Sequence, residues 1–197
     1  MQAVLDACAD LVGRDGYAQL RTHAIAERAG VSVGTLYQYY PNKEAVAGAL
    51  VLRALERMQA AMRQALAECV ERSLESLAAT EHLLLTSLDV LTGERAVFGR
   101  LAGEAPELFR TAAARDLQRA LIDLSQDIRL ASGDSLDFPM PEADAWIIGH
   151  MVSASMLQIS LLPAPDAERR RLAREVARLV CRMALSQARG AADRPAA

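Results

Sequence analysis

Two short helical segments separated by a glycine constrain this chain more than any other feature of its sequence. The segments are THAIAERA at 22–29 and VGTLYQY at 33–39, and Gly30 follows the first of them. Counted from Thr22, four residues occupy the positions that two closely crossing helices need: Ala26 is fifth, Gly30 ninth, Val31 tenth and Leu36 fifteenth. A small side chain permits the crossing, glycine adopts a positive φ at low cost, and the apolar residues point into a shared core. The spacing predicts a helix-turn-helix.

The residues around these segments mark where neighbouring helices begin and end. Apolar side chains at helical spacing over 2–14 predict a first helix that Gly16 ends. Ser32 is expected to cap the helix that runs to about Tyr39, and Pro41 disfavours helical geometry at the residue before it. Asn42 is expected to cap a fourth helix that runs to about residue 70.

The remaining sequence reads as longer helices. We expect them over 73–92, 94–103, from near Pro106 to Gly133, over 142–162, and over 166–189, the last capped by Asp166 and ended by Gly190. Residues 133–141 are expected to form a loop, and the tail 191–197 to be disordered. Strong helix formers dominate a chain that is 52% hydrophobic, so the predicted fold class is all-α.

This reading divides the chain into an N-terminal three-helix DNA-binding domain at 1–48 and a helical domain at 49–190. The boundary falls inside the fourth helix, so no flexible linker is expected.

Charge and cysteine content exclude several classes of protein. A net charge of −3 excludes a polybasic nucleic-acid coat, although a weakly acidic chain can bind DNA through a local patch. Cys8, Cys69 and Cys181 are odd in number and widely spaced, which argues against a disulfide framework. No apolar run reaches the roughly 18 residues of a membrane-spanning helix, and no signal peptide is evident, so a cytoplasmic protein is expected.

The sequence contains no recognisable catalytic or cofactor motif. Its histidines and cysteines lack metal-ligand spacing, and it has neither a glycine-rich phosphate loop nor a G-x-S-x-G sequence. We therefore expect no enzymatic activity, no metal and no cofactor.

The side chains of residues 33–39 suit contact with DNA. Hydroxyl groups on Thr35, Tyr37 and Tyr39 can bond phosphates and base edges, and Gln38 can pair with adenine in the major groove. Gly34 permits close approach, and the N-terminus of the helix suits a phosphate. A tyrosine cluster is often plain core, and we expect this for Tyr40, which should point inward.

Two further phosphate contacts are expected beside this helix, at Lys43 and at the pair Arg21 and His23. Residues 1–50 nevertheless hold four Lys or Arg against five Asp or Glu, a net charge of −1. A single copy should bind DNA weakly, because phosphate neutralisation supplies most non-specific affinity. A dimer would double the contacts.

The run AERAGVSVGTLYQYYPNKEA, within residues 4–50, resembles the TetR family of transcriptional regulators. The resemblance implies a subunit of about nine helices that forms a homodimer, represses transcription and releases DNA when a small molecule enters its C-terminal domain. By motif position, it implies DNA contacts at Thr22, His23, Val33, Gly34, Thr35, Tyr37, Gln38, Tyr39 and Lys43. Arg21 departs from the family, in which a hydroxyl residue often begins the second helix, so capping is expected from Thr22. The chain also begins at the first helix, where many members carry a preceding basic arm.

Two helices are candidates for the dimer interface. The helix at 142–162 carries small residues that permit close helix approach, and the last helix carries an apolar stripe. The residues concerned are Ala145, Gly149, Ser153 and Met156 on the first, and Leu172, Val176, Leu179 and Met183 on the second. Two such helices per subunit can form a four-helix bundle. Packing within one chain is the alternative.

An effector site is expected among apolar residues of the C-terminal domain. The candidates are Leu84, Leu88, Phe98, Phe109, Trp146, His150 and Met151. They could line an apolar cavity for a mostly apolar small molecule or fill a solid core. Two other functions stay open: a thiol-based redox sensor using Cys69 or Cys181, and a helical DNA-binding dimer without an effector.

Overall fold

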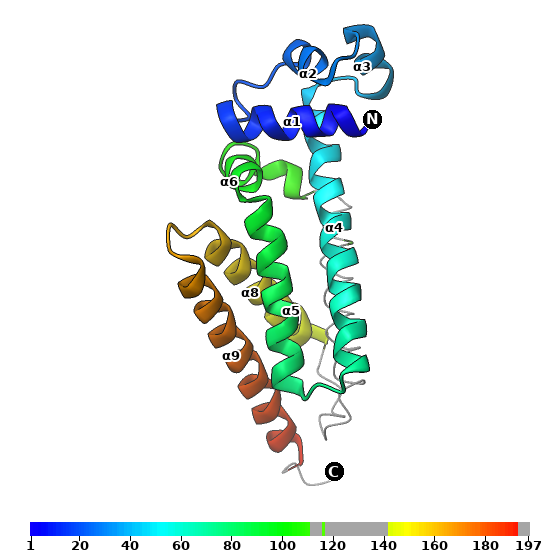
Figure 1. The fold of residues 1–197 in the computed structure, drawn as a ribbon. Helices are drawn as coiled ribbons and strands as arrows, with labels where there is room; N and C mark the ends of the chain where they lie inside the picture. The colour runs from blue at the N-terminus through cyan, green and yellow to red at the C-terminus, as the bar shows by residue number, and fades with distance from the viewer. Residues whose placement is uncertain (111–115, 117–141, 193–197) are drawn as a thin grey trace. The chain divides into compact units, whose positions relative to one another are not determined.

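The computed structural model describes residues 1–110, 116 and 142–192, and the regular elements in those ranges are all helical (Figure 1). They are α1 (Gln2–Asp15), α2 (Thr22–Ala29), α3 (Val33–Tyr39), α4 (Lys43–Glu71), α5 (Ser76–Gly93), α6 (Arg95–Glu104), the 3-10 helix η1 (Pro106–Arg110), α8 (Glu142–Leu161) and α9 (Asp166–Ala192). The predicted all-α fold class is confirmed. Most of the helix expected from Pro106 to Gly133, the loop at 133–141 and the tail from residue 193 lie outside the described residues.

The chain packs into two compact units. Unit 1 comprises Met1–Arg57 and Gly93–Asp116, and unit 2 comprises Met58–Thr92 and the described residues of Leu117–Ala197. Unit 1 therefore contains α1 to α3, α6 and the first part of α4. The functional boundary expected at residue 48 stays a prediction.

The core of unit 1 follows the periodicity of its helices. The buried residues of α1 are Val4, Leu5, Ala7, Cys8, Leu11 and Val12, which recur on one helical face as predicted. Residues from α2, α3, α4 and α6 complete the same cluster, among them Ile25, Leu36, Leu50 and Leu101. Because α6 packs against α1, a helix from the middle of the chain supports the helix-turn-helix.

Several helix ends of unit 1 confirm the local predictions. Gly16 and Gly30 adopt φ values of 85° and 68°, where a side chain would be strained. Ser32 Oγ accepts a hydrogen bond of 2.9 Å from the Thr35 amide, and Asn42 Oδ1 accepts one of 2.8 Å from the Ala45 amide. Tyr40 is extended, with a φ of −134° before Pro41.

Some expected helix ends are wrong. Arg21 stands at the N-cap of α2 without a side-chain cap, and Thr22 lies inside the helix with its hydroxyl 3.1 Å from that of Tyr37. α9 continues past Gly190 to Ala192, because one helical glycine costs only about 1 kcal/mol relative to alanine. Asp166 is the first residue of α9, and its carboxylate pairs with Arg170 at 2.8 Å.

Unit 2 contains the second part of α4 with α5, α8 and α9. One cluster joins α4 to α5 through Met58, Met62, Ala65, Cys69, Ala79 and Leu83. Another joins α5, α8 and α9 through Leu84, Leu88, Met156, Ile159, Ala173 and Ala177. Within the residues described, no helix is both long and apolar enough to span a bilayer.

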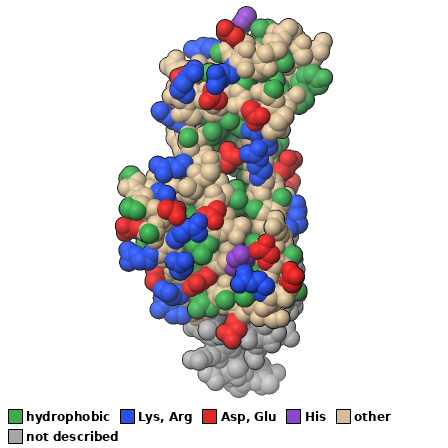
Figure 2. All heavy atoms as spheres, viewed as in Figure 1, with side chains coloured by type: hydrophobic (Ala, Val, Ile, Leu, Met, Phe, Trp, Pro, Cys, Tyr) green, Lys and Arg blue, Asp and Glu red, His purple; other side chains and the backbone are tan. Residues whose placement is uncertain are grey.

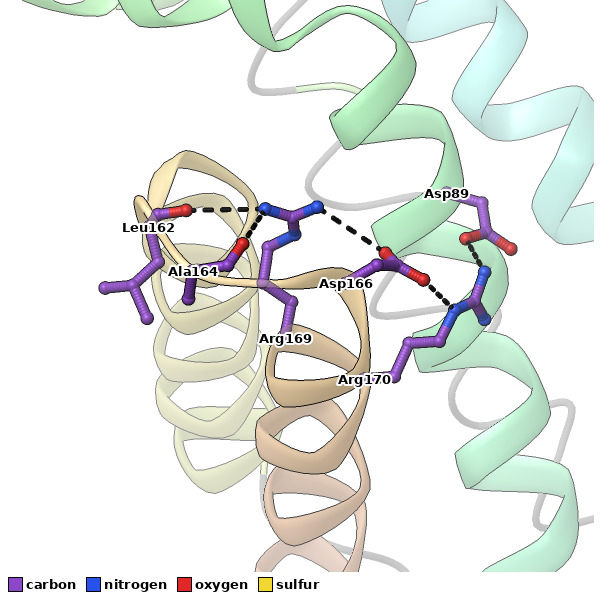
Figure 3. A network of polar contacts seen from close by, with 6 residues as sticks. All are labelled: Asp89, Leu162, Ala164, Asp166, Arg169 and Arg170. Carbon is purple, nitrogen blue, oxygen red and sulfur yellow. Dashed lines mark hydrogen bonds and ion pairs between the residues drawn. The ribbon is translucent and has the colours of Figure 1, made fainter.

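A buried arginine fixes the turn between α8 and α9 (Figure 3). Arg169 Nη1 donates to the carbonyl oxygens of Ala164 and Leu162 at 2.5 and 3.5 Å. The neighbouring Arg170 pairs with Asp89 of α5 as well as with Asp166. These bonds satisfy carbonyl groups that follow the last turn of α8, and they hold the two helices as an antiparallel pair.

Candidate nucleic-acid interface

α3 buries one side chain and exposes most of the rest. Leu36 is 1% exposed, whereas Tyr37 and Tyr39 are 49% and 60% exposed. Gly34, Thr35 and Gln38 are exposed as well, and Figure 2 shows green side chains, a colour that includes tyrosine, on the surface at α3. Tyr40 is buried, as its place beyond the helix predicted. Hydroxyl, amide and aromatic groups thus form one outward face on a helix that a buried leucine anchors.

Hydrogen bonds orient two of these side chains before any ligand arrives. The hydroxyl groups of Thr22 and Tyr37 lie 3.1 Å apart and join α2 to α3. The hydroxyl groups of Ser32 and Thr35 lie 2.8 Å apart at the first turn of α3. Ordered side chains lose less conformational entropy when they bind, which favours contact with a regular surface such as a DNA groove.

Two cations beside this face are held by backbone carbonyl groups. Lys43 Nζ lies 4.6 Å above the ring centroid of Tyr17 and 3.4 Å from the Tyr17 carbonyl oxygen. Arg21 Nη1 donates to the carbonyl oxygens of Ala18 and Leu20, each at 3.0 Å. Carbonyl contacts leave the full positive charge in place.

Other arginines of unit 1 are neutralised by carboxylates. Arg14 pairs with Asp15 at 2.7 Å, and Arg28 pairs with Asp10 at 2.5 Å. Arg53 on α4 pairs with Asp6 at 2.5 Å. Arg21 and Lys43 are therefore the cations of this face best placed to attract an anion.

The residues predicted to contact DNA lie on three neighbouring helix segments of unit 1. Thr22 and His23 lie in the first turn of α2, Lys43 begins α4, and the other six lie on α3. Val33 is half-buried and packs against the core, so only part of its side chain faces outward. Their role stays a prediction. Arg21 is not in the set implied by the family resemblance, but its position at the start of α2 already predicted a phosphate contact together with His23.

The residues predicted to line an effector cavity are divided between the two units, and their role stays a prediction. The rings of Phe98 and Phe109 contact each other in unit 1, tilted by 42° with centroids 5.8 Å apart, and Leu84 and Leu88 belong to the core of unit 2. Trp146 and Met151 are exposed on α8. The His150 ring lies 3.8 Å from that of Trp146, and its Nδ1 is 2.9 Å from the Trp146 carbonyl oxygen.

The predicted dimer residues differ in exposure. Met156 is buried within unit 2, and Leu172 and Val176 pack partly against the same cluster. Leu179 and Met183 are 51% and 40% exposed on α9. Ala145, Gly149 and Ser153 lie on α8. An exposed apolar strip therefore remains on α9, while Met156 serves the intrachain core.

The cysteines are poorly placed for redox chemistry. Burial raises the pKa of the Cys8 thiol to about 12 and raises the pKa of Cys69, which disfavours the reactive thiolate. Cys69 is buried, so its expected accessibility is wrong, while Cys181 is half-buried with its sulfur 3.5 Å from Thr80 Oγ1. In the ranges the structure describes, no cluster of His, Cys, Asp and Glu could hold a metal ion.

The paired short helices, the glycine turn and the exposed second helix define a helix-turn-helix protein. Residues 4–50 match the family described as bacterial regulatory proteins, tetR family. Residues 4–50 therefore carry the N-terminal DNA-binding domain of that family.

Curated relatives resemble the N-terminal region only. The HTH-type transcriptional repressor KstR of Rhodococcus jostii is 42% identical over 55 residues, which cover 28% of this chain and 26% of the relative. KstR of Mycobacterium tuberculosis is 45% identical over 40 residues, covering 20% of this chain and 18% of that protein. The matched segments thus span between 18% and 28% of the length of the curated relatives that match. Both are named as transcriptional repressors and not as enzymes.

Solved structures show the same fold over most of the chain. The fatty acid degradation regulator FadR from Bacillus halodurans has a TM-score of 0.70 at 20% identity, covering 90% of this chain and 92% of that one. FadR from Bacillus subtilis, solved in complex with stearoyl-CoA, has a TM-score of 0.66 at 18% identity, covering 90% and 96%. At these identities, the similarity establishes the fold alone.

Proposed function

We propose that this chain is a homodimeric transcriptional repressor that binds a palindromic operator and releases it when a small, mostly apolar effector binds unit 2. The observation that carries DNA binding is the exposed face of α3, where Leu36 is anchored in the core and Tyr37 and Tyr39 are open to solvent. Phenol, hydroxyl and amide groups on such a face can bond phosphates and base edges in a major groove. Binding to chromosomal DNA would place the chain in the bacterial cytoplasm.

The charge of the DNA-binding residues supports a dimer. Arg21 and Lys43 give each copy only a few phosphate contacts, which is little for a stable complex. Two copies related by a twofold axis would place two α3 helices in successive major grooves, about 34–36 Å apart, and would double those contacts.

The exposed apolar strip of α9 supports the same conclusion. Leu172, Val176, Leu179 and Met183 recur every three or four residues, so they lie on one side of the helix. Leu179 and Met183 are exposed, whereas Leu172 and Val176 pack partly against the core of unit 2. Ala173 and Ala177 occupy a different side and are fully buried in unit 2. We infer that the strip pairs with its copy in a second subunit, with exposed Ile147 and Met151 of α8 as further contacts.

An apolar effector is supported by the composition of unit 2 and by one structural neighbour. The core between α5, α8 and α9 is lined by leucine, isoleucine, methionine and alanine. The Bacillus subtilis FadR structure contains stearoyl-CoA, so this fold can accommodate an acyl chain. A thiol-based sensor is less well supported, because Cys8 and Cys69 are buried.

Release would proceed by a shift between two conformations of the dimer. α4 is continuous from Lys43 to Glu71, so one helix begins at the proposed phosphate contact and ends in unit 2. An effector that binds more tightly when the two α3 helices are wrongly spaced would lower the population able to bind DNA.

The first experiment is selection of duplexes from a random library by the purified full-length protein, followed by anisotropy titration at two salt concentrations. An enriched inverted repeat, bound in the presence of competitor DNA, supports the proposal, and absence of enrichment contradicts it. Stearoyl-CoA is the first effector probe, with coenzyme A and stearate as matched controls. Release by stearoyl-CoA alone would support an acyl thioester effector. If no apolar probe releases the DNA, the alternative function, a DNA-binding dimer without an effector, is supported instead.

A further inference from the structure

In the loop between α1 and α2, residues 16–20, the peptide group that joins Tyr17 to Ala18 contacts a carboxylate on one side and an ammonium group on the other. The Ala18 amide donates a hydrogen bond of 2.8 Å to Glu104 Oε2, at the end of α6. The carbonyl of the same peptide group, that of Tyr17, accepts from Lys43 Nζ at 3.4 Å. A carboxylate at the N–H end and an ammonium at the C=O end polarise the peptide in the same sense, so each bond strengthens the other.

The Glu104 carboxylate can approach the loop because Gly16 has no side chain. A Cβ atom on Gly16 would lie 2.9 Å from Glu104 Oε1, which is closer than such contacts occur. Gly16 also has a φ of 85°, so a glycine suits the backbone and the contact together. Arg100 approaches the same carboxylate at 3.6 Å, one helical turn earlier on α6.

We propose that Glu104 is a positioning residue for DNA binding, acting through the Tyr17–Ala18 peptide to place the ammonium of Lys43. Glu104 is the last residue of α6 and lies 86 residues from Ala18 in the sequence. Its carboxylate fixes the direction of the peptide, the carbonyl oxygen fixes Lys43, and the Tyr17 ring below the ammonium completes the support. This inference rests on the proposed function, because it requires Lys43 to meet a phosphate.

The negative charge of Glu104 lets an experiment distinguish a positioning role from a direct electrostatic effect on DNA. Removal of a carboxylate from a DNA-binding unit should by itself strengthen DNA binding, because it removes repulsion from phosphates. We expect the opposite for Glu104→Ala. The Tyr17 carbonyl would then be held only by the Leu20 amide at 3.1 Å and by Lys43, so the peptide could turn and displace Lys43. Glu104→Gln keeps an oxygen acceptor for the Ala18 amide and should bind DNA at least as tightly as the wild type.

The test is a double-mutant cycle on the full-length protein with the duplex that the wild type selects from a random library. Glu104→Ala should weaken binding roughly tenfold and should reduce the salt dependence by about one phosphate contact per subunit. Combined with Lys43→Ala, it should cause little further loss, because both changes remove the same contact. Glu107→Gln, which removes a neighbouring carboxylate, is the charge control and should not weaken binding.

Hydrogen exchange at residues 16–20 provides a second readout. The Ala18 amide should exchange faster in Glu104→Ala and near the wild-type rate in Glu104→Gln. If Glu104→Ala does not fold, Gly16→Ala displaces the carboxylate instead and should show the same dependence on Lys43. Wild-type affinity in Glu104→Ala, or an undiminished loss in the Lys43→Ala background, overturns the inference alone. Failure of the wild type to select any duplex overturns the proposed function and the inference together.

Discussion

The hydroxyl groups of Thr22 and Tyr37 lie 3.1 Å apart, so the first residue of α2 holds the most central tyrosine of α3. The bond spans the two helices of the helix-turn-helix on their exposed side. It fixes the ring of Tyr37 while leaving 49% of that residue open to solvent. The orientation of a proposed DNA contact is therefore set by a residue outside α3.

Removal of this bond should weaken DNA binding with little effect on folding. Thr22→Val and Tyr37→Phe each delete one hydroxyl, and a net hydrogen bond is worth about 1 kcal/mol, or roughly fivefold in affinity. Anisotropy titrations of both variants and of the double variant measure the coupling between the two residues. Strictly additive losses would show that Thr22 contacts DNA independently of Tyr37. Thermal melting should stay close to wild type, because both hydroxyl groups lie at the surface.

Two glycines of the helix-turn-helix should respond in opposite ways to alanine. Gly34 lies in α3 with ordinary helical φ, and a Cβ there would make only a normal 3.7 Å contact with Ser32 Oγ. Gly34→Ala should therefore preserve or raise stability by up to about 1 kcal/mol while weakening DNA binding, because the methyl group projects from the exposed face. Gly30→Ala should lower stability by roughly 1–2 kcal/mol, since a φ of 68° strains any side chain even in open space.

Urea denaturation and anisotropy titration separate these two effects. The reverse pattern, with Gly34→Ala destabilised and still binding DNA normally, would mean that α3 does not approach the duplex along Gly34.

The helix-turn-helix could be predicted from the sequence because its helix ends depend on residues adjacent in the chain. Gly30, Ser32 and Pro41 each act on adjacent backbone, through a left-handed turn, a cap and a blocked helical conformation. These effects need no knowledge of the tertiary fold. The structure agrees at every one of these positions.

Contacts between distant residues could not be predicted in the same way. Helical periodicity says which side of a helix is apolar, but it does not say what covers that side. Phe98 and Phe109, for example, contact each other in unit 1, and their spacing in the sequence does not indicate that contact. The partner of Ala18 lies 86 residues away, and nothing in the local sequence around Glu104 marks it.

A charge introduced on the apolar strip of α9 should dissociate the proposed dimer. Leu179→Glu places a carboxylate at a residue that is 51% exposed in one chain and would be buried between two. Burial of an unpaired charge costs several kcal/mol, so the variant should be monomeric in light scattering at micromolar concentration. Leu77→Glu, at an exposed leucine of α5, is the matched control and should behave like the wild type. A dimeric Leu179→Glu protein would place the interface elsewhere.

Stability should fall in alkaline solution because two acidic hydroxyl or thiol groups are buried in unit 1. Burial raises the pKa of Cys8 from 9.0 to about 12, and burial together with Glu44 raises the pKa of Tyr17 from 10.0 to about 12. Both groups release their protons more readily in the unfolded chain. The contribution of Cys8 is fully present below pH 9 and is lost as the pH rises from about 9 to 12, and that of Tyr17 is lost between about 10 and 12. Each group can lower the stability by up to about 1.4 kcal/mol per pH unit within its window.

Urea denaturation at half-unit steps between pH 8 and 11 measures this slope. Cys8→Ala should be less stable than the wild type at pH 8 because it leaves a small cavity, but its stability should fall less steeply with pH. The difference between the two slopes isolates Cys8 from the many surface groups that titrate in the same range. Parallel slopes for the two proteins would contradict the raised pKa of the buried thiol, since a group that titrates equally in the folded and unfolded chain contributes no pH dependence.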